Sequence, residues 1–155
     1  MWHFAMAMVV SNEAMWVRRG GSGDDASERD PVDLKPLIEM GLLAVLAPET
    51  DAETDDFVAL AAVLDDGEAM TAALAIHRGA AIATDDRKAL RVIRGRAPGL
   101  RLLSTADLLH SWAQGANVDP GILAAALRNL RSRAHFLPPR QDPLRSWWDA
   151  ASQDP

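Results

Sequence analysis

Between residues 42 and 114 the chain alternates short apolar runs with stretches of helical periodicity, and this alternation limits its fold more than any other feature. The apolar runs at 42–47, 80–84 and 100–104 have the length and composition of buried strands. The full order is strand, helix, helix, strand, helix, strand, helix, which is typical of a parallel α/β sheet. We therefore predict an α/β fold with a mostly parallel sheet.

Capping signals predict where the helices in this region begin. Thr50 and Glu53 have the spacing of a capping box and open a helix over 51–64, and Asp65 and Glu68 repeat that spacing. The second helix carries small and apolar residues on most sides, so we expect it to be buried. Further along, residues 87–94 predict a helix with Ala89, Leu90, Val92 and Ile93 turned inward, and Thr105 is expected to cap a last helix over 105–113.

The segments on either side of this region are less regular. Residues 4–10 predict a buried strand, followed by a helix from Ser11 or Asn12 to Val17 and a Gly- and Asp-rich loop over 20–31. A short helix is expected over 34–40. After residue 115 we expect a helix over about 120–132 and then an extended arm bracketed by Pro120, Pro138, Pro139 and Pro143.

Composition excludes several classes of site and of protein. The chain has no cysteine, which removes disulfides, zinc–thiolate centres and thiol nucleophiles. The four histidines lack the spacing of metal ligands, and no P-loop or dinucleotide fingerprint is present. No apolar run approaches the roughly 20 residues that cross a bilayer, and the first residues make a poor signal peptide, so we expect a cytoplasmic protein with no membrane partner.

The charge is divided along the chain. Residues 1–86 carry 17 acidic and 5 basic side chains, whereas residues 87–155 carry 5 acidic and 11 basic ones. The carboxylates could serve a metal ion and the arginines a phosphate backbone, although two oppositely charged faces of one domain explain the same pattern. In the basic part, Arg128 and Arg131 share a helix face and are candidates for phosphate contacts. We expect Trp147 and Trp148 to pack as apolar anchors rather than to stack on bases.

Acidic residues recur after strands or at helix starts. Glu13, Glu68 and the pair Asp85–Asp86 all occupy such positions, and ligands of open α/β sheets bind beyond the carboxyl ends of the strands. Folded together, these carboxylates would form an all-oxygen site suited to Mg²⁺ or Mn²⁺, which can support phosphodiester hydrolysis. The alternative for each of them is a helix-capping or first-turn role.

The stretch LDDGEAMTAALAIHRGAAIATDDRKALRVI resembles the second half of a PIN domain, and LRLLSTADLLHSWA resembles that family's last strand and helix. The resemblance covers roughly residues 4–114. It implies a three-layer α/β/α sandwich over residues 1–115, with an Arg-rich helix and a Pro/Trp arm over 116–155. It also implies Mg²⁺- or Mn²⁺-dependent ribonuclease activity of the VapC toxin type on an RNA substrate, and it leaves open an antitoxin protein as partner and a homodimer.

Carried over by position, the resemblance assigns Glu13, Glu68 and Asp86 to the catalytic metal site, with Asp85 as a further metal-site acid and Arg87 beside it for RNA. An alternative alignment puts Asn12 in place of the family's first Asp. With Glu13 preferred, the family's first strand and its Asp have no counterpart, so we expect an N-terminally shortened PIN-like domain. Two further hypotheses follow: a PIN-like binding or regulatory protein that no longer cleaves RNA, and a partner-dependent fragment whose acids only cap helices.

Overall fold

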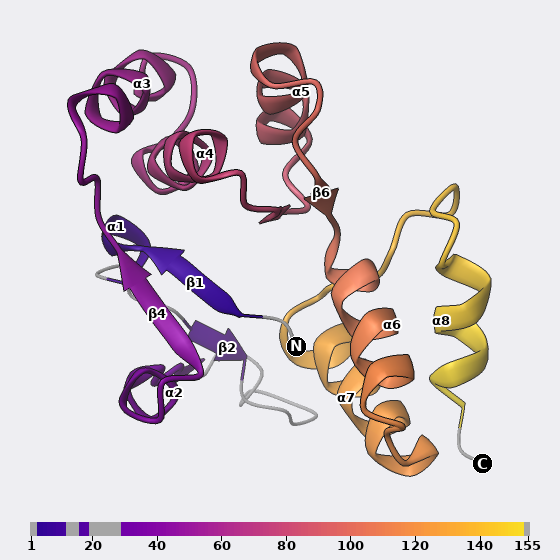
Figure 1. Cartoon of the computed structure of the whole chain (residues 1–155). Helices are drawn as coiled ribbons and strands as arrows, with labels where there is room; N and C mark the ends of the chain where they lie inside the picture. The colour runs from indigo at the N-terminus through magenta and orange to yellow at the C-terminus, as the bar shows by residue number, and fades with distance from the viewer. Residues whose placement is uncertain (1–2, 12–15, 19–28, 154–155) are drawn as a thin grey trace. The chain divides into compact units, whose positions relative to one another are not determined.

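The computed structural model describes residues 3–11, 16–18 and 29–153 of this chain. The described residues form two compact units, one within residues 1–14 and 33–103 and the other within residues 15–32 and 104–155. Each unit is made of helices and two-stranded sheets (Figure 1).

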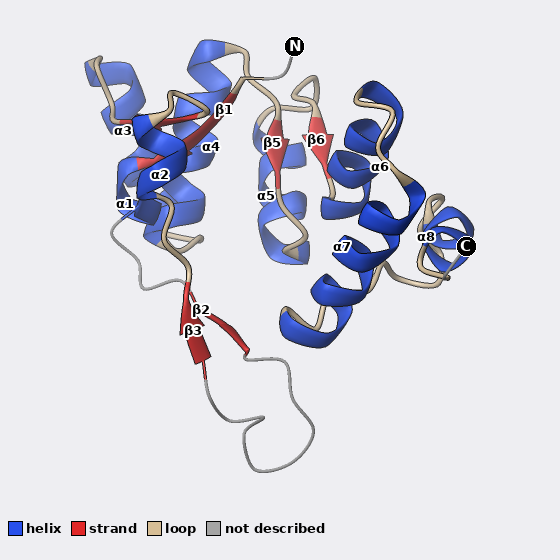
Figure 2. Ribbon diagram, turned by 90° about the horizontal axis from the view of Figure 1, so that it is seen from below, coloured by secondary structure: helices blue, strands red, loops and turns tan. Residues whose placement is uncertain are grey.

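The first unit is a mixed α/β structure, which confirms the predicted class. In chain order its elements are β1 (Phe4–Ala7), α1 (Met8–Ser11), α2 (Lys35–Glu39), β4 (Leu43–Leu46), α3 (Asp51–Ala61), α4 (Asp66–Arg78), β5 (Ile82–Ala83), α5 (Arg87–Arg96) and β6 (Leu102–Leu103). β1 pairs with β4 and β5 pairs with β6, and both pairs are parallel. The described strands of this unit therefore form two short parallel sheets, not a single continuous one (Figure 2).

The predicted helix starts are largely confirmed. Thr50 and Glu53 form a complete capping box at α3, and the Asp65 side chain accepts a hydrogen bond from the Glu68 N–H at the start of α4. α4 ends at Gly79, whose φ of +63° is a left-handed conformation that glycine adopts without steric strain.

The core of the first unit is built around α4, as its composition predicts. Small side chains let α3 approach this helix closely, Ala89 and Ile93 of α5 join the same core, and Ala7 of β1 packs with Met70 and Leu74. Fully buried alanines of α4 and α5 line these contacts: Ala69, Ala72, Ala73 and Ala89. Leu90 and Val92 are half-buried and Ile93 is buried, so the inward face predicted for α5 is confirmed.

The second unit is mainly helical. It contains the antiparallel pair β2 (Trp16–Arg18) and β3 (Arg29–Pro31), followed by α6 (Thr105–Gly115), α7 (Pro120–Arg133) and α8 (Arg145–Ala151). Its core joins Ala106, Leu123, Leu127 and Trp148. α6 belongs to this core, whereas the sequence expectation grouped residues up to 115 with the preceding strands.

Two predictions near the N-terminus are wrong. The strand expected over 4–10 ends at Ala7, and residues 8–11 form the short helix α1. Trp16 and Val17 lie in strand β2 rather than in a helix, which suits aromatic and β-branched side chains. β3 likewise occupies Arg29–Pro31, the end of the expected loop; the rest of the expected helix and loop, 12–15 and 19–28, lies outside the described residues.

Two further corrections concern helix boundaries. Ser104, not Thr105, caps α6, and its partner in the capping box is Asp107. The expected C-terminal arm contains a helix, α8, supported by an Arg145–Asp149 ion pair with N–O separation of 2.9 Å. Trp148 is 1% exposed and Trp147 packs on the same core, so their predicted role as packing anchors is confirmed. Among the described residues, no helix is long and apolar enough to span a membrane.

Candidate functional site

The N-terminus of α4 places two carboxylates together. Asp65 is the N-cap, and its Oδ1 accepts a hydrogen bond of 2.8 Å from the Glu68 N–H. Glu68 lies one turn into the helix, where its half-buried side chain lines a cavity of about 320 Å³. The Asp65 N–H in turn acts as a hydrogen-bond donor toward the Glu68 carboxylate and lowers its pKa.

Asp86 follows β5 and caps α5. Its Oδ1 accepts from the Ala89 N–H at 2.7 Å, and its own N–H donates to the Thr84 hydroxyl at 3.1 Å. Asp86 therefore has the helix-capping role that was the alternative to a metal-binding one, and Asp85 beside it is exposed. One carboxylate oxygen of Asp86 is engaged by the cap, as is one of Asp65.

The electrostatics show which acids the fold brings near one another. Partial burial raises the pKa of Glu68, and the negative charges of Asp65 and Asp86 raise it further. The hydrogen bond from the Asp65 N–H and the charge of Lys88 act in the opposite direction and lower this pKa. Asp65 and Asp86 thus lie close enough to Glu68 for the three carboxylates to be treated as one cluster.

The cavity beside this cluster lies within the first unit. Its walls come from β1, α4, β5 and α5, and they are apolar away from the carboxylates. It is lined by Ala5, Met6, Val10, Asp65, Gly67, Glu68, Thr71, Ile82, Ala83, Thr84, Ala89 and Ile93.

The remaining predicted site residues have separate locations. Glu13 lies outside the described residues. Arg87 is the first residue of α5 and follows Asp86 directly. Arg128 and Arg131 are exposed on α7 in the second unit, and an Arg128 Nη1 donates to the Ser152 carbonyl at 3.5 Å.

The chemistry of the carboxylate cluster suits a hard divalent cation. Its donors are all oxygens, and a cation would relieve the repulsion that raises the pKa of Glu68. Within residues 3–11, 16–18 and 29–153, no three His, Cys, Asp or Glu side chains already stand in the arrangement of a metal site. The cluster therefore fits a divalent ion by its donor type and charge.

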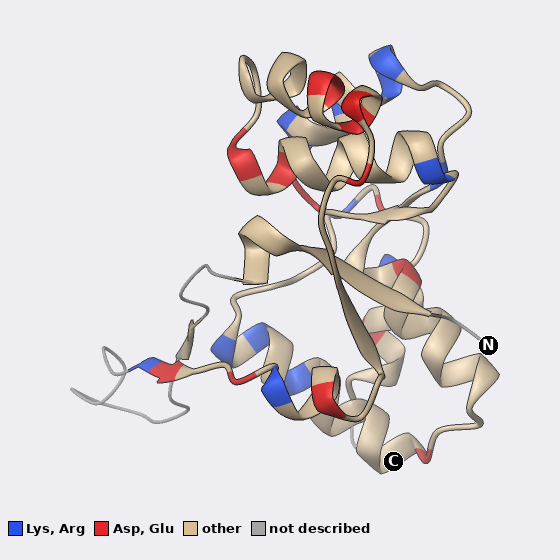
Figure 3. Cartoon of the chain, turned by 60° about the vertical axis from the view of Figure 1, so that its left-hand side comes forward, with Lys and Arg blue, Asp and Glu red and all other residues tan. Residues whose placement is uncertain are grey.

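A row of basic side chains extends from the cluster along α5. Arg87, Lys88, Arg91 and Arg94 are all exposed, and none forms an ion pair within the described part of the chain (Figure 3 marks Lys and Arg in blue). The sequence prediction singled out only Arg87. Lys88, Arg91 and Arg94 are spaced three residues apart, and this spacing could have predicted that they share an exposed face of the helix.

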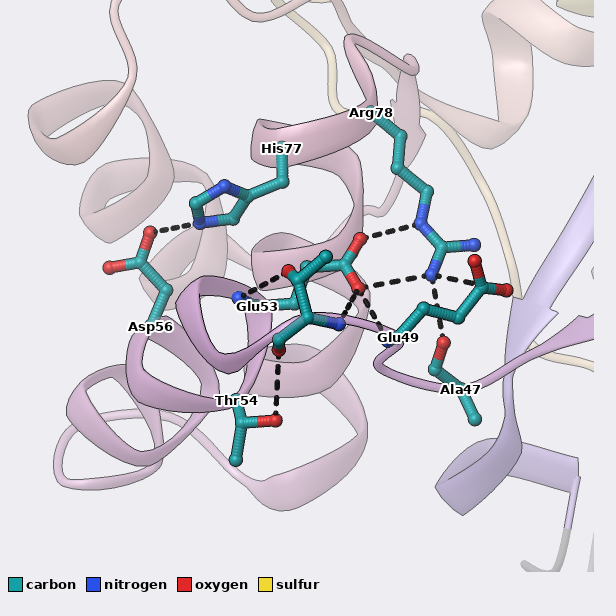
Figure 4. A network of polar contacts seen from close by, with 8 residues as sticks. Ala47, Glu49, Glu53, Thr54, Asp56, His77 and Arg78 are labelled. Atoms are coloured by element: carbon teal, nitrogen blue, oxygen red, sulfur yellow. Dashed lines mark hydrogen bonds and ion pairs between the residues drawn. The ribbon is translucent and has the colours of Figure 1, made fainter.

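A second polar network was missed by the sequence prediction. Glu53 is 4% exposed and binds Arg78 of α4 through an Nε–Oε1 contact of 2.7 Å, while Arg78 also donates to the Ala47 carbonyl (Figure 4). The Arg78 guanidinium and the N–H groups of Glu49 and Thr50 lower the pKa of Glu53 to about 2. This network fastens α3 to α4, and none of its members lines the cavity.

Comparison of the chain with protein-family models, with curated proteins and with solved structures finds no match. What can be said of function therefore rests on the residues and geometry described above.

Proposed function

We propose that this chain is a PIN-like, Mg²⁺- or Mn²⁺-dependent endoribonuclease. The observation that carries the proposal is the half-buried Glu68 held beside Asp65 and Asp86, at the end of β5 and at the mouth of a cavity. Clustered carboxylates next to a cavity are typical of functional sites, because a fold gains nothing in stability from like charges held together.

In this proposal Glu68 and Asp86 hold the cation, with Asp85 and Glu13 as further acids suggested by the resemblance. A bound Mg²⁺ or Mn²⁺ would supply a nucleophilic water and stabilise negative charge on the phosphate. The chain's own contribution is orientation. The bond from the Ala89 N–H holds one oxygen of Asp86 and leaves the other available, while packing of the alanine face of α4 fixes the position of Glu68.

The basic face of α5 is the proposed RNA contact. This face carries Arg87, Lys88, Arg91 and Arg94 and begins at the residue after Asp86. An RNA strand whose phosphates bind along it would therefore extend to the carboxylate cluster. Arg128 and Arg131 on the second unit remain proposed phosphate contacts. The PIN-like three-layer architecture, an antitoxin partner and a homodimer belong to the same proposal and are supported by the sequence resemblance alone. A cytoplasmic location is proposed from the composition of the sequence.

The test compares cleavage of a structured RNA in Mn²⁺ by the wild type, Asp86→Asn and Asp66→Asn. Asparagine caps helices as well as aspartate does, so Asp86→Asn is expected to fold normally while losing at least about 100-fold in rate, the scale on which such electrostatic contributions act. Asp66 lies on the same turn as Glu68 but does not line the cavity, so its variant should cleave at the wild-type rate. Equal cleavage by all three proteins would contradict the site.

A second candidate is a PIN-like binding or regulatory protein that does not cleave RNA. It is favoured by the capping bonds of Asp65 and Asp86, which each occupy one carboxylate oxygen. This candidate predicts RNA binding that depends on α5 but no product after prolonged incubation with Mn²⁺, whereas cleavage abolished by Asp86→Asn would exclude it.

A further inference from the structure

The two parallel sheets of the first unit each leave an edge beside the same cavity. In the described part of the chain β1 pairs only with β4, and β5 pairs only with β6. Ala5 and Met6 of β1 line the cavity on one side and Ile82 and Ala83 of β5 line it on the other. The cavity therefore has a strand edge on two of its walls, with α4 packed against both strands.

The hydrogen-bond register of β5 shows where its unused backbone groups point. The Ile82 N–H donates to the Arg101 carbonyl at 2.9 Å, and the Thr84 N–H donates to the Leu103 carbonyl at 3.0 Å. In a parallel ladder alternate residues bond to the same neighbour, so the N–H and C=O of Ala83 face away from β6. Ala83 is exposed and lines the cavity, and within the described residues its N–H and C=O do not bond to β6, so a further strand could pair with them.

The walls also indicate the side chains that such a strand would carry. Besides the carboxylates and two threonines, the lining residues are apolar and mostly small. Glu68 and Asp65 belong to the lining, and Glu68 interacts electrostatically with Asp86, which follows the C-terminal end of β5. A strand running parallel to β5 would bring its C-terminal end to this negative charge, where a Lys or Arg is favoured.

We propose that the cavity between β1 and β5 binds an extended apolar segment of a partner polypeptide as an added parallel strand, with a basic side chain at its C-terminal end facing Glu68. A strand satisfies backbone groups on the cavity walls, which neither a helix nor a small apolar molecule would do.

The experiment uses the full chain in EDTA and two synthetic peptides, acetyl-VAVVAK-amide and acetyl-VAVVAE-amide. Amide hydrogen exchange by NMR follows Ala83, whose N–H should exchange fast in the free protein while that of Ile82 is protected. Saturation with the Lys peptide should slow exchange at Ala83 at least tenfold. The Glu peptide should bind at least about tenfold more weakly, which corresponds to one favourable charge pair.

Two variants test whether the Ala83 N–H is required for peptide binding. Ala83→Pro removes the N–H that faces the cavity and should abolish binding of the Lys peptide, since β5 keeps its bonds to β6 through residues 82 and 84. Ala83→Val keeps that N–H and should bind the Lys peptide like the wild type. Thermal melts establish that both variants fold, and the exchange measurement on the wild type stands without them.

Three outcomes would overturn the proposal. They are unchanged exchange at Ala83 in saturating Lys peptide, equal affinity for the two peptides, and protection of Ala83 that rises with protein concentration alone, which would identify a second copy as the occupant. Peptide binding and RNA cleavage are measured separately. A negative result for peptide binding therefore does not contradict the proposed nuclease function, and a negative result for cleavage does not contradict peptide binding.

Discussion

Glu53 shows how a single buried charge can be stabilising. Its side chain joins a capping box, an ion pair with Arg78 and a hydrogen bond from the Glu49 N–H at 2.7 Å. Each of these contacts favours the charged carboxylate, and together they lower its pKa to about 2. The capping box was predictable from Thr50 and Glu53 because both lie within one turn. The partnership with Arg78 was not, because it depends on the packing of α3 against α4.

The low pKa of Glu53 predicts how stability changes with acid. In the unfolded chain this carboxyl titrates near 4.5, whereas in the fold it titrates near 2. The stabilisation it provides is therefore complete above about pH 4.5 and is lost as the pH falls from 4.5 toward 2. Thermal melts of the wild type should show Tm falling through this window, and Glu53→Gln should show a lower Tm at pH 7 and a shallower fall.

A second carboxylate, Asp56, limits how much the acid-induced fall in Tm differs between the wild type and Glu53→Gln. Arg96 and His77 lower its pKa as well, so part of the acid dependence persists in the Glu53→Gln variant. A variant whose Tm matches the wild type at pH 7 and follows the same curve to pH 2 would contradict the assigned role of Glu53.

Among the elements, α5 has the clearest division of faces. Ala89 and Ile93 are buried, and Arg87, Lys88, Arg91 and Arg94 are exposed on the other side. The periodicity of residues 87–94 was sufficient to predict this helix and its buried face, because local spacing decides both. The strands were harder to predict from the sequence. β5 and β6 contain two residues each, and whether such short segments join a larger sheet is decided by tertiary contacts that no local pattern records.

The exposed face of α5 predicts a salt-dependent contribution to RNA binding. Replacing Lys88, Arg91 and Arg94 by Gln removes three phosphate contacts at most, and each contact on a single strand contributes about 0.7 to the slope of log K against log salt. The slope measured by fluorescence anisotropy with a single-stranded RNA should therefore fall by about 2.

A control for this measurement is Lys35→Gln, which removes an exposed lysine of α2 that pairs with Glu39. It should leave both affinity and slope unchanged. If the triple variant binds RNA with the wild-type slope, α5 is not the contact surface.

At the scale of the whole molecule, the described residues form two units with separate cores. One core surrounds α4, and the other surrounds Trp148 and Leu127. The sequence resemblance predicted a boundary near residue 115, where the similarity to a PIN domain ends. The packing instead joins α6 to α7 and α8, because its inward residues Ala106, Leu109 and Ala113 meet that core. The periodicity of an amphipathic helix predicts which of its faces is buried, but not which core that face packs against.

Separate cores predict that damage to one unit stays local. Trp148→Ala empties the centre of the second unit and should destabilise it by about 3–5 kcal/mol, as large-to-small core substitutions do. Hydrogen exchange by mass spectrometry should show faster exchange in α6, α7 and α8, with α4 and α5 unchanged. Equal acceleration in α4 would mean that the two units unfold as one.

The proposed function depends most directly on whether the carboxylate cluster binds a divalent ion. Calorimetric titration with Mn²⁺ at neutral pH should show saturable binding by the wild type and by Asp66→Asn, and binding at least about tenfold weaker in Glu68→Gln, a loss of roughly 1.4 kcal/mol or more. Because burial and its neighbours raise the pKa of Glu68 and only the deprotonated carboxylate binds metal, affinity should also increase as the pH rises through that raised value. Mn²⁺ binding that is absent in the wild type, or unaffected by Glu68→Gln, would contradict the account.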